Sequence, residues 1–308
     1  MNKIIVFGHK NPDTDTIVSS LVLADYFKNN LKLEAEAFRL GELNNETKFV
    51  LEDLGIEFPK MITQIKSGEK VALVDHNELD QSLPGLDFSQ VDYIFDHHKL
   101  AIETEKPIFV RVEPLGSTAS LLAKMFQEKK VIFTPIIAKL LLAGIFSDTL
   151  NLTSPTTTEE DKEIVTKLNE IALINQEDFV QKMFTAKSSL EGIAIKDIIT
   201  LDYKEFTTAK TKIGVGVWET TLPDKINEKK DLIWTALEKQ KKENQLDYLF
   251  FMVVDILQKN SYLYLISEKE TKLAQAIFSG KIEKNILFLK GVVSRKKQVV
   301  PPLIRELS

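Results

Sequence analysis

Histidine and aspartate side chains cluster near the start of this sequence in a pattern that could bind metal ions. The chain has 308 residues and four histidines, all of which lie within the first 98 residues. They stand in three polar segments that follow short apolar runs, namely Gly8–Asp15, Asp75–Asn77 and Asp96–Lys99. Imidazole and carboxylate groups together are suitable ligands for a divalent transition metal ion. The sequence therefore predicts a metal site.

Each cluster also has a simpler structural explanation. Asp13 or Thr14 could cap the first turn of a helix, and Asp75 could form a turn after a strand. Asp148 ends an apolar helix, where the helix dipole opposes its charge and a nearby cation would offset that cost. An ordinary turn residue is the alternative there. Because three clusters follow three strands, we favour the metal site over three independent turns.

A basic segment near the C-terminus is the natural counterpart of the acidic clusters. Ser294–Gln298 contains Arg295, whose planar guanidinium matches phosphate oxygens, and Lys296, which adds a point charge. Lys204 is a weaker candidate of the same kind, and an exposed basic turn is the plain alternative. Residues 1–187 carry 20 Lys and Arg against 29 Asp and Glu, whereas residues 188–308 carry 20 against 16. This division predicts that one half holds cations and the other meets an anion, unless it only reflects chance surface composition.

Strands and helices alternate in the first half of the chain. We expect strands at 4–7, 33–40, 71–74, 91–95 and 108–112, and helices at 15–30, 44–54, 116–128 and 135–146. A further helix should start at the capping box Thr157-x-x-Glu160 and run to about residue 171. This alternation predicts an α/β fold with a doubly wound parallel sheet. Ligands bind at the carboxyl ends of such strands, where the three clusters lie.

The second half predicts a smaller, mixed α+β domain. A polar stretch at Thr185–Glu191 is the expected linker, which divides the chain into domains 1–187 and 188–308. We expect strand pairs at 206–208 with 213–218 and at 248–257 with 262–267, and helices at 224–244 and 271–278. The lysines of 225–242 have a single aromatic residue among them, Trp234, and no repeated interleaving of aromatic and basic residues, so we expect no nucleic-acid partner.

The sequence also carries expectations about location. No run approaches the about 20 apolar residues of a membrane span, and the N-terminus does not read as a signal peptide. Cysteine is absent, which excludes disulfides and thiolate ligands and fits a reducing compartment. We therefore expect a cytoplasmic protein with no membrane partner.

The motifs together resemble the DHH phosphoesterase superfamily, and the complete set resembles its family II, manganese-dependent inorganic pyrophosphatases. The resemblance rests on the three clusters, Val112–Thr118, Ser147-Asp148 and Ser294–Gln298, in that order along the whole chain. The Gly-Gly-Gly-His motif of the nuclease branch is absent. The resemblance implies an N-terminal DHH domain, a C-terminal DHHA2-type domain and an active site in the cleft between them.

The resemblance also implies roles for individual residues. One metal ion would bind His9, Asp13 and Asp75, and the other would bind Asp15, Asp75, His97 and Asp148, with Asp75 bridging. Two Mn²⁺ or Co²⁺ ions per chain would share a hydroxide that attacks pyrophosphate, which arrives with Mg²⁺. Lys204, Arg295 and Lys296 would hold the phosphate groups, and His98 would contact the bridging or leaving-group oxygen as a proton donor. Family members associate through their first domains, which implies a homodimer.

Two other functions compete with this interpretation. One is a phosphodiesterase or exopolyphosphatase of the same superfamily, which would lack the terminal basic motif. The other is a metal-dependent anion-binding protein without catalysis, which would tolerate the loss of a ligand.

Overall fold

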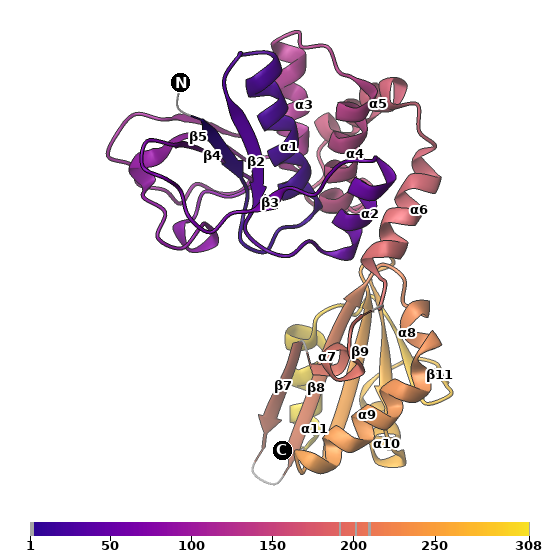
Figure 1. Cartoon of the computed structure of the whole chain (residues 1–308). Coiled ribbons are helices and arrows are strands. Elements are labelled where there is room, and N and C mark those ends of the chain that lie inside the picture. Colours follow the sequence, from indigo (N-terminus) through magenta and orange to yellow (C-terminus); the bar gives the residue numbers. More distant parts are fainter. Residues whose placement is uncertain (1–2, 191, 201, 209–210, 308) are drawn as a thin grey trace. The chain divides into compact units, whose positions relative to one another are not determined.

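The computed structural model describes residues 3–190, 192–200, 202–208 and 211–307. The chain forms two compact units, Met1–Ala186 and Lys187–Ser308 (Figure 1). Within the expected linker, Glu191 lies outside the described residues.

The first unit is built on a six-stranded sheet in which every neighbouring pair is parallel, as the sequence predicts. The strand order is β3-β2-β1-β4-β5-β6. The chain thus extends the sheet to one side of β1 first and then to the other, so β1 and β4 flank the point where the strand order reverses. The strands are β1 (Ile4–Phe7), β2 (Ala35–Arg39), β3 (Lys60–Met61), β4 (Lys70–Val74), β5 (Val91–Asp96) and β6 (Phe109–Val112).

Helices pack on one face of this sheet (Figure 1). Helix α4 is buried among its neighbours, as its apolar sequence predicts. At Gly144, an added Cβ would lie 2.8 Å from Ala119, from Val18 and from a carboxylate oxygen of Asp15, so only glycine permits this close approach of α1 and α4. The helices are α1 (Thr14–Asn29), α2 (Asn45–Asp53), α3 (Thr118–Glu128), α4 (Pro135–Thr149), α5 (Glu159–Ala172) and α6 (Gln176–Lys187).

Loops and short 3-10 turns cover the other face of the sheet. Buried Leu83 and Leu86 pack there against the apolar side chains of β1, β4 and β5, together with half-buried Phe88 and Ile65. The two turns are Leu79–Gln81 and Phe88–Gln90.

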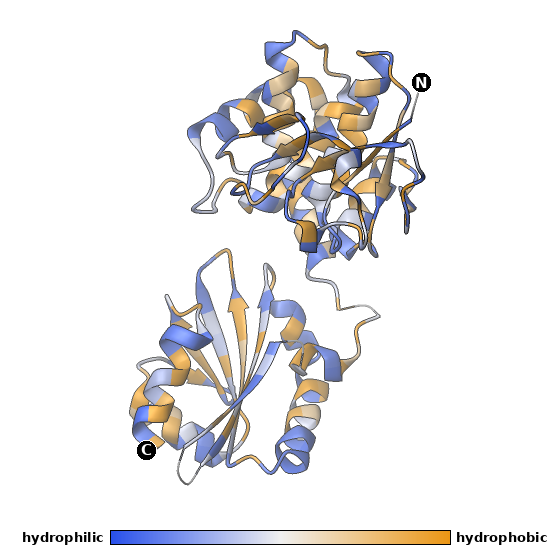
Figure 2. Cartoon of the chain, turned by 90° about the vertical axis from the view of Figure 1, so that its left-hand side faces the viewer, coloured by the Kyte–Doolittle hydropathy of each residue, from blue (hydrophilic) through white to orange (hydrophobic). Residues whose placement is uncertain are grey.

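The second unit is a mixed sheet with helices on both faces. Its strand order is β11-β12-β10-β9-β8-β7, and all neighbours are antiparallel except β8 and β9. Alternate side chains of β9 enter two separate cores, with Phe250 and Met252 on one face and Phe251 and Val253 on the other. Figure 2 shows apolar residues along the strands of this sheet and in the helices beside it.

The elements of this unit are α7 (Ile195–Thr200), β7 (Asp202–Thr207), β8 (Lys212–Thr220), α8 (Asp224–Glu228), α9 (Lys230–Glu243), β9 (Tyr248–Asp255), β10 (Asn260–Leu265), α10 (Glu268–Ile277), β11 (Ile282–Glu283), β12 (Ile286–Lys290), a π-helical turn (Arg295–Val299) and α11 (Val300–Leu307). Both expected strand pairs form, as β7 with β8 and β9 with β10. The parallel contact between β8 and β9 places the two pairs in one sheet.

Two local predictions were wrong. The helix expected over 224–244 is two helices, because Lys229 leaves helical geometry and its ammonium group donates a hydrogen bond to the carbonyl of Leu190. The capping box lies one residue later than expected, at Thr158 and Asp161. The fully buried Asp161 carboxylate also accepts the backbone N–H of Gly116, which fixes the register of the box.

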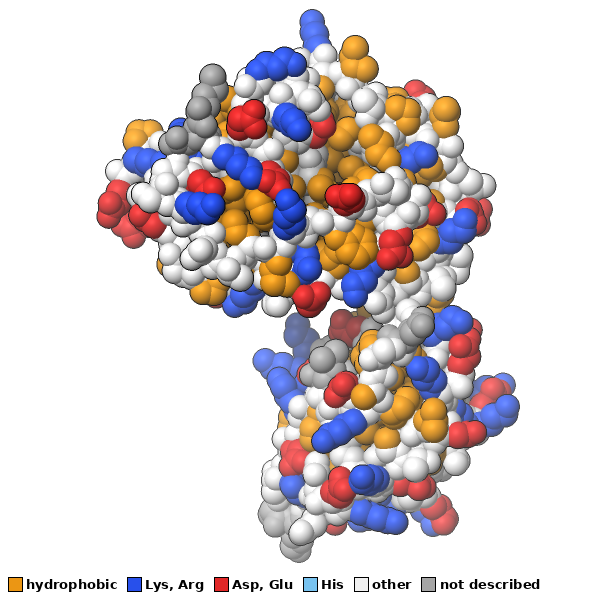
Figure 3. Space-filling model, viewed as in Figure 1, with side chains coloured by type: hydrophobic (Ala, Val, Ile, Leu, Met, Phe, Trp, Pro, Cys, Tyr) orange, Lys and Arg blue, Asp and Glu red, His pale blue; other side chains and the backbone are white. Residues whose placement is uncertain are grey.

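No helix within the described residues is long and apolar enough to cross a membrane. On the face shown in Figure 3, basic and acidic side chains are interspersed on both units. The difference in net charge between the halves of the sequence therefore does not appear as a surface of one sign in that view.

Candidate metal centre

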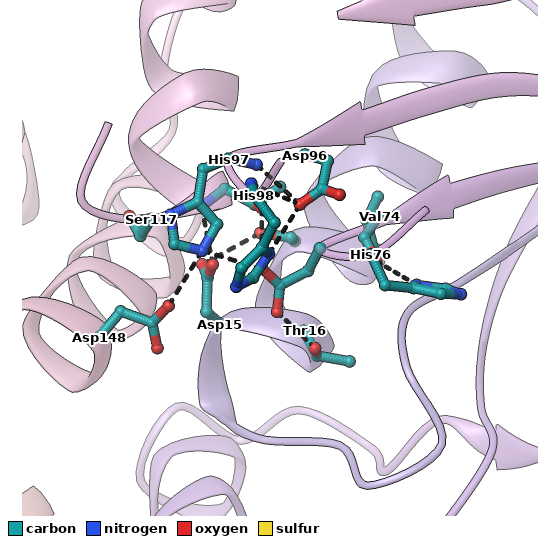
Figure 4. Close-up of polar contacts among 12 residues, drawn as sticks. Asp15, Thr16, Val74, His76, Asp96, His97, His98, Ser117 and Asp148 are labelled. Carbon is teal, nitrogen blue, oxygen red and sulfur yellow. Dashed lines mark hydrogen bonds and ion pairs between the residues drawn. The ribbon is translucent and has the colours of Figure 1, made fainter. Parts of the chain in front are cut away.

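The polar clusters of the first unit meet where the carboxyl ends of β1, β4 and β5 face the ends of three helices (Figure 4). Asp13 and Asp15 lie at the N-terminus of α1, and Asp148 lies in the last turn of α4. The amino end of α3 completes the arrangement, because its first backbone amides point at Asp15. The site thus lies at the reversal point of the sheet, where open α/β sheets bind ligands.

Three groups of side chains in the described residues could each hold a metal ion. The first contains His9, Asp13 and Asp75, and the second contains Asp15, Asp75, His97 and Asp148. In each group, the potential ligand atoms lie within 4.8 Å of one another. A third group, Asp75, His97 and His98, overlaps the second. All six residues expected as metal ligands are therefore brought together.

Asp75 connects the two main groups, with one oxygen toward each. Its Oδ2 lies 3.4 Å from Nε2 of His9, and its Oδ1 lies 3.4 Å from Nε2 of His97. The same two oxygens accept hydrogen bonds from the hydroxyls of Thr16 and Thr118, at 2.6 and 2.9 Å. Its backbone has a φ of 60°, in the left-handed region that a non-glycine residue rarely adopts. Such strain is commonly kept at functional sites.

His97 is held in the orientation of a metal ligand. Its Nδ1 lies 3.0 Å from the carbonyl of Leu115, which fixes the tautomer with the proton on Nδ1 and leaves Nε2 with a lone pair. Nε2 is buried, makes no hydrogen bond within the described residues, and lies 3.6 Å from Oδ2 of Asp148. A buried acceptor beside two carboxylates fits a cation that shares all three.

Asp15 belongs to α1, and its fully buried carboxylate faces the N-terminus of a second helix, α3. Its two oxygens accept the backbone N–H groups of Thr118 and Ala119 at 2.7 and 2.9 Å. Burial, and then the charge of Asp75, raise the pKa of Asp15 well above its usual range. Two carboxylates so close and so deeply buried favour a bound cation, which would allow both to stay ionised.

Protons balance this negative charge when no metal ion does. Burial alone would lower the pKa of His9, but hydrogen bonds to Asp13 and Asp75 raise it to about 10. Burial likewise opposes the charged form of His97, whereas Asp75 and Asp15 raise its pKa to about 9. Burial would raise the pKa of Asp75, yet His9 and His97 hold it well below its usual range. A metal ion would take the place of these imidazole protons, since histidine binds metal in its neutral form.

Asp13 combines the two roles that the sequence left open. Its Oδ1 accepts the backbone N–H of Thr16 at 2.9 Å and so caps α1. Its Oδ2 lies 3.5 Å from Nε2 of His9 and remains in the first group. The helix cap therefore orients the second oxygen toward the candidate ion.

His98 belongs to the third group, lies outside the two main groups, and is half exposed. Its Nδ1 donates to Oδ1 of the buried Asp96 at 2.9 Å, which directs Nε2 away from that aspartate. This hydrogen bond raises the pKa of His98 despite its partial burial. Asp96 also accepts both backbone N–H groups of His97 and His98, and its other oxygen accepts the amide of Asn77.

The fourth histidine, His76, does not join either group. Its Nδ1 contacts the carbonyl of Val74 at 3.0 Å, and its ring points away from the ligands in Figure 4. Burial lowers its pKa, which keeps the ring neutral.

The basic residues expected to bind phosphate lie in the second unit. Lys204, on β7, and Lys296, in the π-helical turn, are exposed. Arg295 is more enclosed, because its Nη1 donates to the carbonyls of Asp202 and Val215 and its Nη2 to the Asp202 carboxylate. Val215 pairs with Lys204 across the strands, so Arg295 and Lys204 belong to the same edge of this sheet.

Several supporting residues were missed by the sequence analysis. The hydroxyls of Thr16 and Thr118 hold Asp75, and Asp161 holds Gly116, next to the carbonyl that orients His97. Only Thr118, within the motif Val112–Thr118, carried any signal in the sequence. Asp161 bonds to a residue 45 positions away, which no local pattern reveals.

We expect Mn²⁺ to raise the melting temperature of metal-free protein, because an ion that binds only the folded state stabilises it. A concentration 100 times the dissociation constant adds about 2.7 kcal/mol per site. Asp75→Asn should lose most of this shift, since both groups share that carboxylate. Melting curves with and without Mn²⁺ measure it. Asp92→Asn, which alters a surface carboxylate paired with Lys70 and Lys106, is the control. A full Mn²⁺ shift in Asp75→Asn would contradict the shared role.

Two family models match this chain. The DHH family, N-terminal domain, matches residues 3–145, and the DHHA2 domain matches residues 181–305. The first match contains five of the six expected metal ligands, and Asp148 lies just beyond its end. The second contains Lys204, Arg295 and Lys296.

Curated relatives match over nearly the full length. A probable manganese-dependent inorganic pyrophosphatase of Bacillus velezensis is 40% identical over 305 residues, covering 98% of each chain. The manganese-dependent inorganic pyrophosphatase of Methanocaldococcus jannaschii is 40% identical, over 97% of this chain and 98% of the relative. That of Bacillus subtilis is 39% identical, over 98% of both.

Solved structures share the fold of this chain. The crystal structure of a putative family II inorganic pyrophosphatase from Methanococcus jannaschii has a TM-score of 0.64 and 37% identity, and covers 98% of both chains. An exopolyphosphatase-related protein from Bacteroides fragilis, at 16% identity and a TM-score of 0.52, shares the fold over 99% of this chain and 92% of that one. With identity of 39–40% to curated relatives over almost its entire length, this chain belongs to the family II, manganese-dependent inorganic pyrophosphatases.

Proposed function

We propose that this protein hydrolyses pyrophosphate to two phosphates in a manganese-dependent reaction. The observation that carries the proposal is a pair of ligand groups that share the buried carboxylate of Asp75. It stands in a chain that aligns end to end with relatives named manganese-dependent inorganic pyrophosphatases. The two units would then act as a metal-binding domain (1–187) and a substrate-binding domain (188–308).

Two Mn²⁺ or Co²⁺ ions would bind this site, one in each ligand group. Oxygen ligands predominate, with one imidazole in each group and no thiolate, which suits these ions better than a structural Zn²⁺. Such a pair, when bound, supplies a nucleophile from water near neutral pH and neutralises charge on phosphate oxygens. Pyrophosphate would arrive as its Mg²⁺ complex.

The chain's own contribution begins with rigid placement of the ligands. Strand ends, helix ends and the hydroxyls of Thr16 and Thr118 hold Asp75 before any ion arrives. The tautomer of His97 is likewise fixed by Leu115. Preorganisation of this kind lowers the cost of reaching the transition state, because ligands and dipoles need not rearrange.

His98 is the candidate proton donor. Asp96 binds its Nδ1, and this contact both orients the ring and favours the protonated imidazole. Nε2 is then the atom from which a proton could pass to the oxygen of the departing phosphate. Half exposure of the side chain leaves room for a substrate to reach it.

Lys204, Arg295 and Lys296 would hold the phosphate groups. Arg295 and Lys296 lie in the motif Ser294–Gln298, and hydrogen bonds at its two ends hold its shape. The side chain of Gln298 accepts the backbone N–H groups of Val293 and Ser294, and the side chain of Ser294 accepts the backbone N–H of Lys297. These bonds present the basic side chains in a fixed turn. Arg295 would use the N–H groups of its planar fork that Asp202 and Val215 leave over.

The first prediction concerns the reaction itself. Purified protein with Mn²⁺ or Co²⁺ should release phosphate from pyrophosphate. A chelator should abolish this activity, because it removes the cations that would activate water at the ligand groups. Phosphate release is measured across pyrophosphate, long-chain polyphosphate and a phosphodiester. Preference for polyphosphate or the diester would favour the other branches of the superfamily. Binding of Mn²⁺ without turnover of any of the three would favour an anion-binding protein.

The second prediction concerns the basic motif. Arg295→Ala and Lys296→Ala should each lower kcat/KM roughly tenfold to hundredfold, the equivalent of one charge-assisted hydrogen bond of about 1.5–3 kcal/mol. Both should keep the wild-type metal content, because every candidate ligand lies in the first unit. Elemental analysis and phosphate release measure the two effects. Lys290→Ala, which removes an exposed lysine on β12, should change neither. Normal activity after removal of both Arg295 and Lys296 would mean that the first unit holds the anion alone.

We also propose a homodimer that forms through the first unit. Support comes from β6, which ends the sheet and exposes 49% of Phe109 and 40% of Val110. An exposed apolar edge strand is a ready surface for pairing with a second copy.

Light scattering at micromolar concentration should therefore give twice the mass of one chain. Val110→Lys should shift the protein to the monomer, because it places a charge on the edge strand. Ile132→Lys, at another exposed apolar position of this unit, should remain dimeric. The mass of one chain for the wild type would refute the dimer.

A further inference from the structure

A buried glutamate lies between two of the helix ends that carry metal ligands. Glu46 is the second residue of α2 and has no exposed surface. Its Oε2 accepts the hydroxyl of Thr14 at 2.9 Å and the hydroxyl of Ser147 at 2.6 Å. Glu46 is absent from all three ligand groups of the described residues.

The two hydroxyls belong to immediate neighbours of metal ligands. Thr14 stands between Asp13 and Asp15 in the first turn of α1, and Ser147 precedes Asp148 in the last turn of α4. One carboxylate oxygen therefore ties together the two helix ends from which Asp15 and Asp148 enter the second ligand group. Along the chain, Ser147 lies 101 residues from Glu46, and Thr14 lies 32 residues from it.

Packing alone does not call for a glutamate at this position. A buried carboxyl group loses hydration, and hydrogen bonds recover only part of that loss. Apolar residues of similar volume often serve stability equally well or better at such places. What an apolar side chain cannot do is fix two hydroxyls in direction and distance.

We propose that Glu46 is a positioning residue that sets the separation of Asp15 and Asp148 for the second metal ion. The inference rests on the metal site of the proposed function and does not depend on which substrate is hydrolysed. Because both hydroxyls share one oxygen, loss of either one opens the connection between α1 and α4. Loss of the second hydroxyl should then weaken Mn²⁺ binding only slightly more.

The experiment compares Thr14→Val, Ser147→Ala and the double variant with wild type. Metal-free protein is titrated with Mn²⁺ by calorimetry, and its melting temperature is measured separately without metal. Each single variant should weaken binding of one of the two ions by roughly tenfold to hundredfold, as supporting contacts of metal ligands usually do. The affinity of the double variant for Mn²⁺ should be no lower than that of the single variant with the lower affinity.

A conservative change at Glu46 provides a rescue. Glu46→Gln keeps an oxygen that can accept both hydroxyls, so its Mn²⁺ affinity should stay close to wild type. Glu46→Ala should weaken binding as the hydroxyl variants do. Should Glu46→Ala fail to fold, the two hydroxyl variants still decide the matter.

Ser267→Ala is the matched control. Ser267 donates to Glu270, another fully buried glutamate, but in the second unit. The control should lower the melting temperature without changing Mn²⁺ affinity.

Two results would overturn the proposal. One is Thr14→Val and Ser147→Ala proteins that melt at lower temperature yet bind both Mn²⁺ ions as wild type does. The other is a double variant whose loss of Mn²⁺ binding free energy equals the sum of the losses in the two single variants. Wild-type protein that binds two Mn²⁺ ions without hydrolysing pyrophosphate would refute the proposed function and leave this inference standing.

Discussion

The burial of negative charge at one edge of a parallel sheet is the constraint on which the first unit depends. Asp15 and Asp75 are almost completely enclosed, and carboxylates in such a place need cations, protons or amides close by. The structure supplies the amide ends of α3 to Asp15, threonine hydroxyls to Asp75, and two imidazoles at 3.4 Å from Asp75. Metal ions in the two candidate groups would complete this balance.

The surrounding elements can be understood as devices that aim these groups. The cap of α1 turns Asp13, the buried Asp96 turns His98, and a backbone carbonyl turns His97. Close helix packing at Gly144 keeps α4, and with it the end that carries Asp148, against α1. The second unit is organised differently, because its basic groups are exposed or bound to their own sheet edge. Asp15 and Asp75 at the centre of the candidate metal site are therefore enclosed and fixed, whereas Lys204 and Lys296 stay near water.

Local patterns in the sequence were sufficient for most strands and helices and for the candidate ligands, but the short strands β3 and β11 and the strand β12 were not predicted. Each ligand cluster follows an apolar run, so its place at the carboxyl end of a parallel strand could be predicted. Contacts between distant parts of the chain could not. Asp161 of the capping box accepts the N–H of Gly116, Lys229 at the helix break donates to Leu190, and Glu46 accepts the hydroxyl of Ser147. The sequence alternatives for Asp13 were also not exclusive, since one oxygen caps the helix and the other faces His9.

The strand order has a consequence for how the chain comes to hold its ions. The ligands extend from residue 9 to residue 148, and the sheet places β1 between β2 and β4. On one side, β1 pairs with β2, where Ile4 lies opposite Ala35, and on the other with β4, where Ile4 lies opposite Lys70, 66 residues later. The second pairing closes the longer loop, which makes it the slower to form. Neither ligand group exists in a nascent chain that ends before β4, and the second needs α4 as well. The first group would therefore be complete once Asp75 is in place, and the second only after α4 with Asp148.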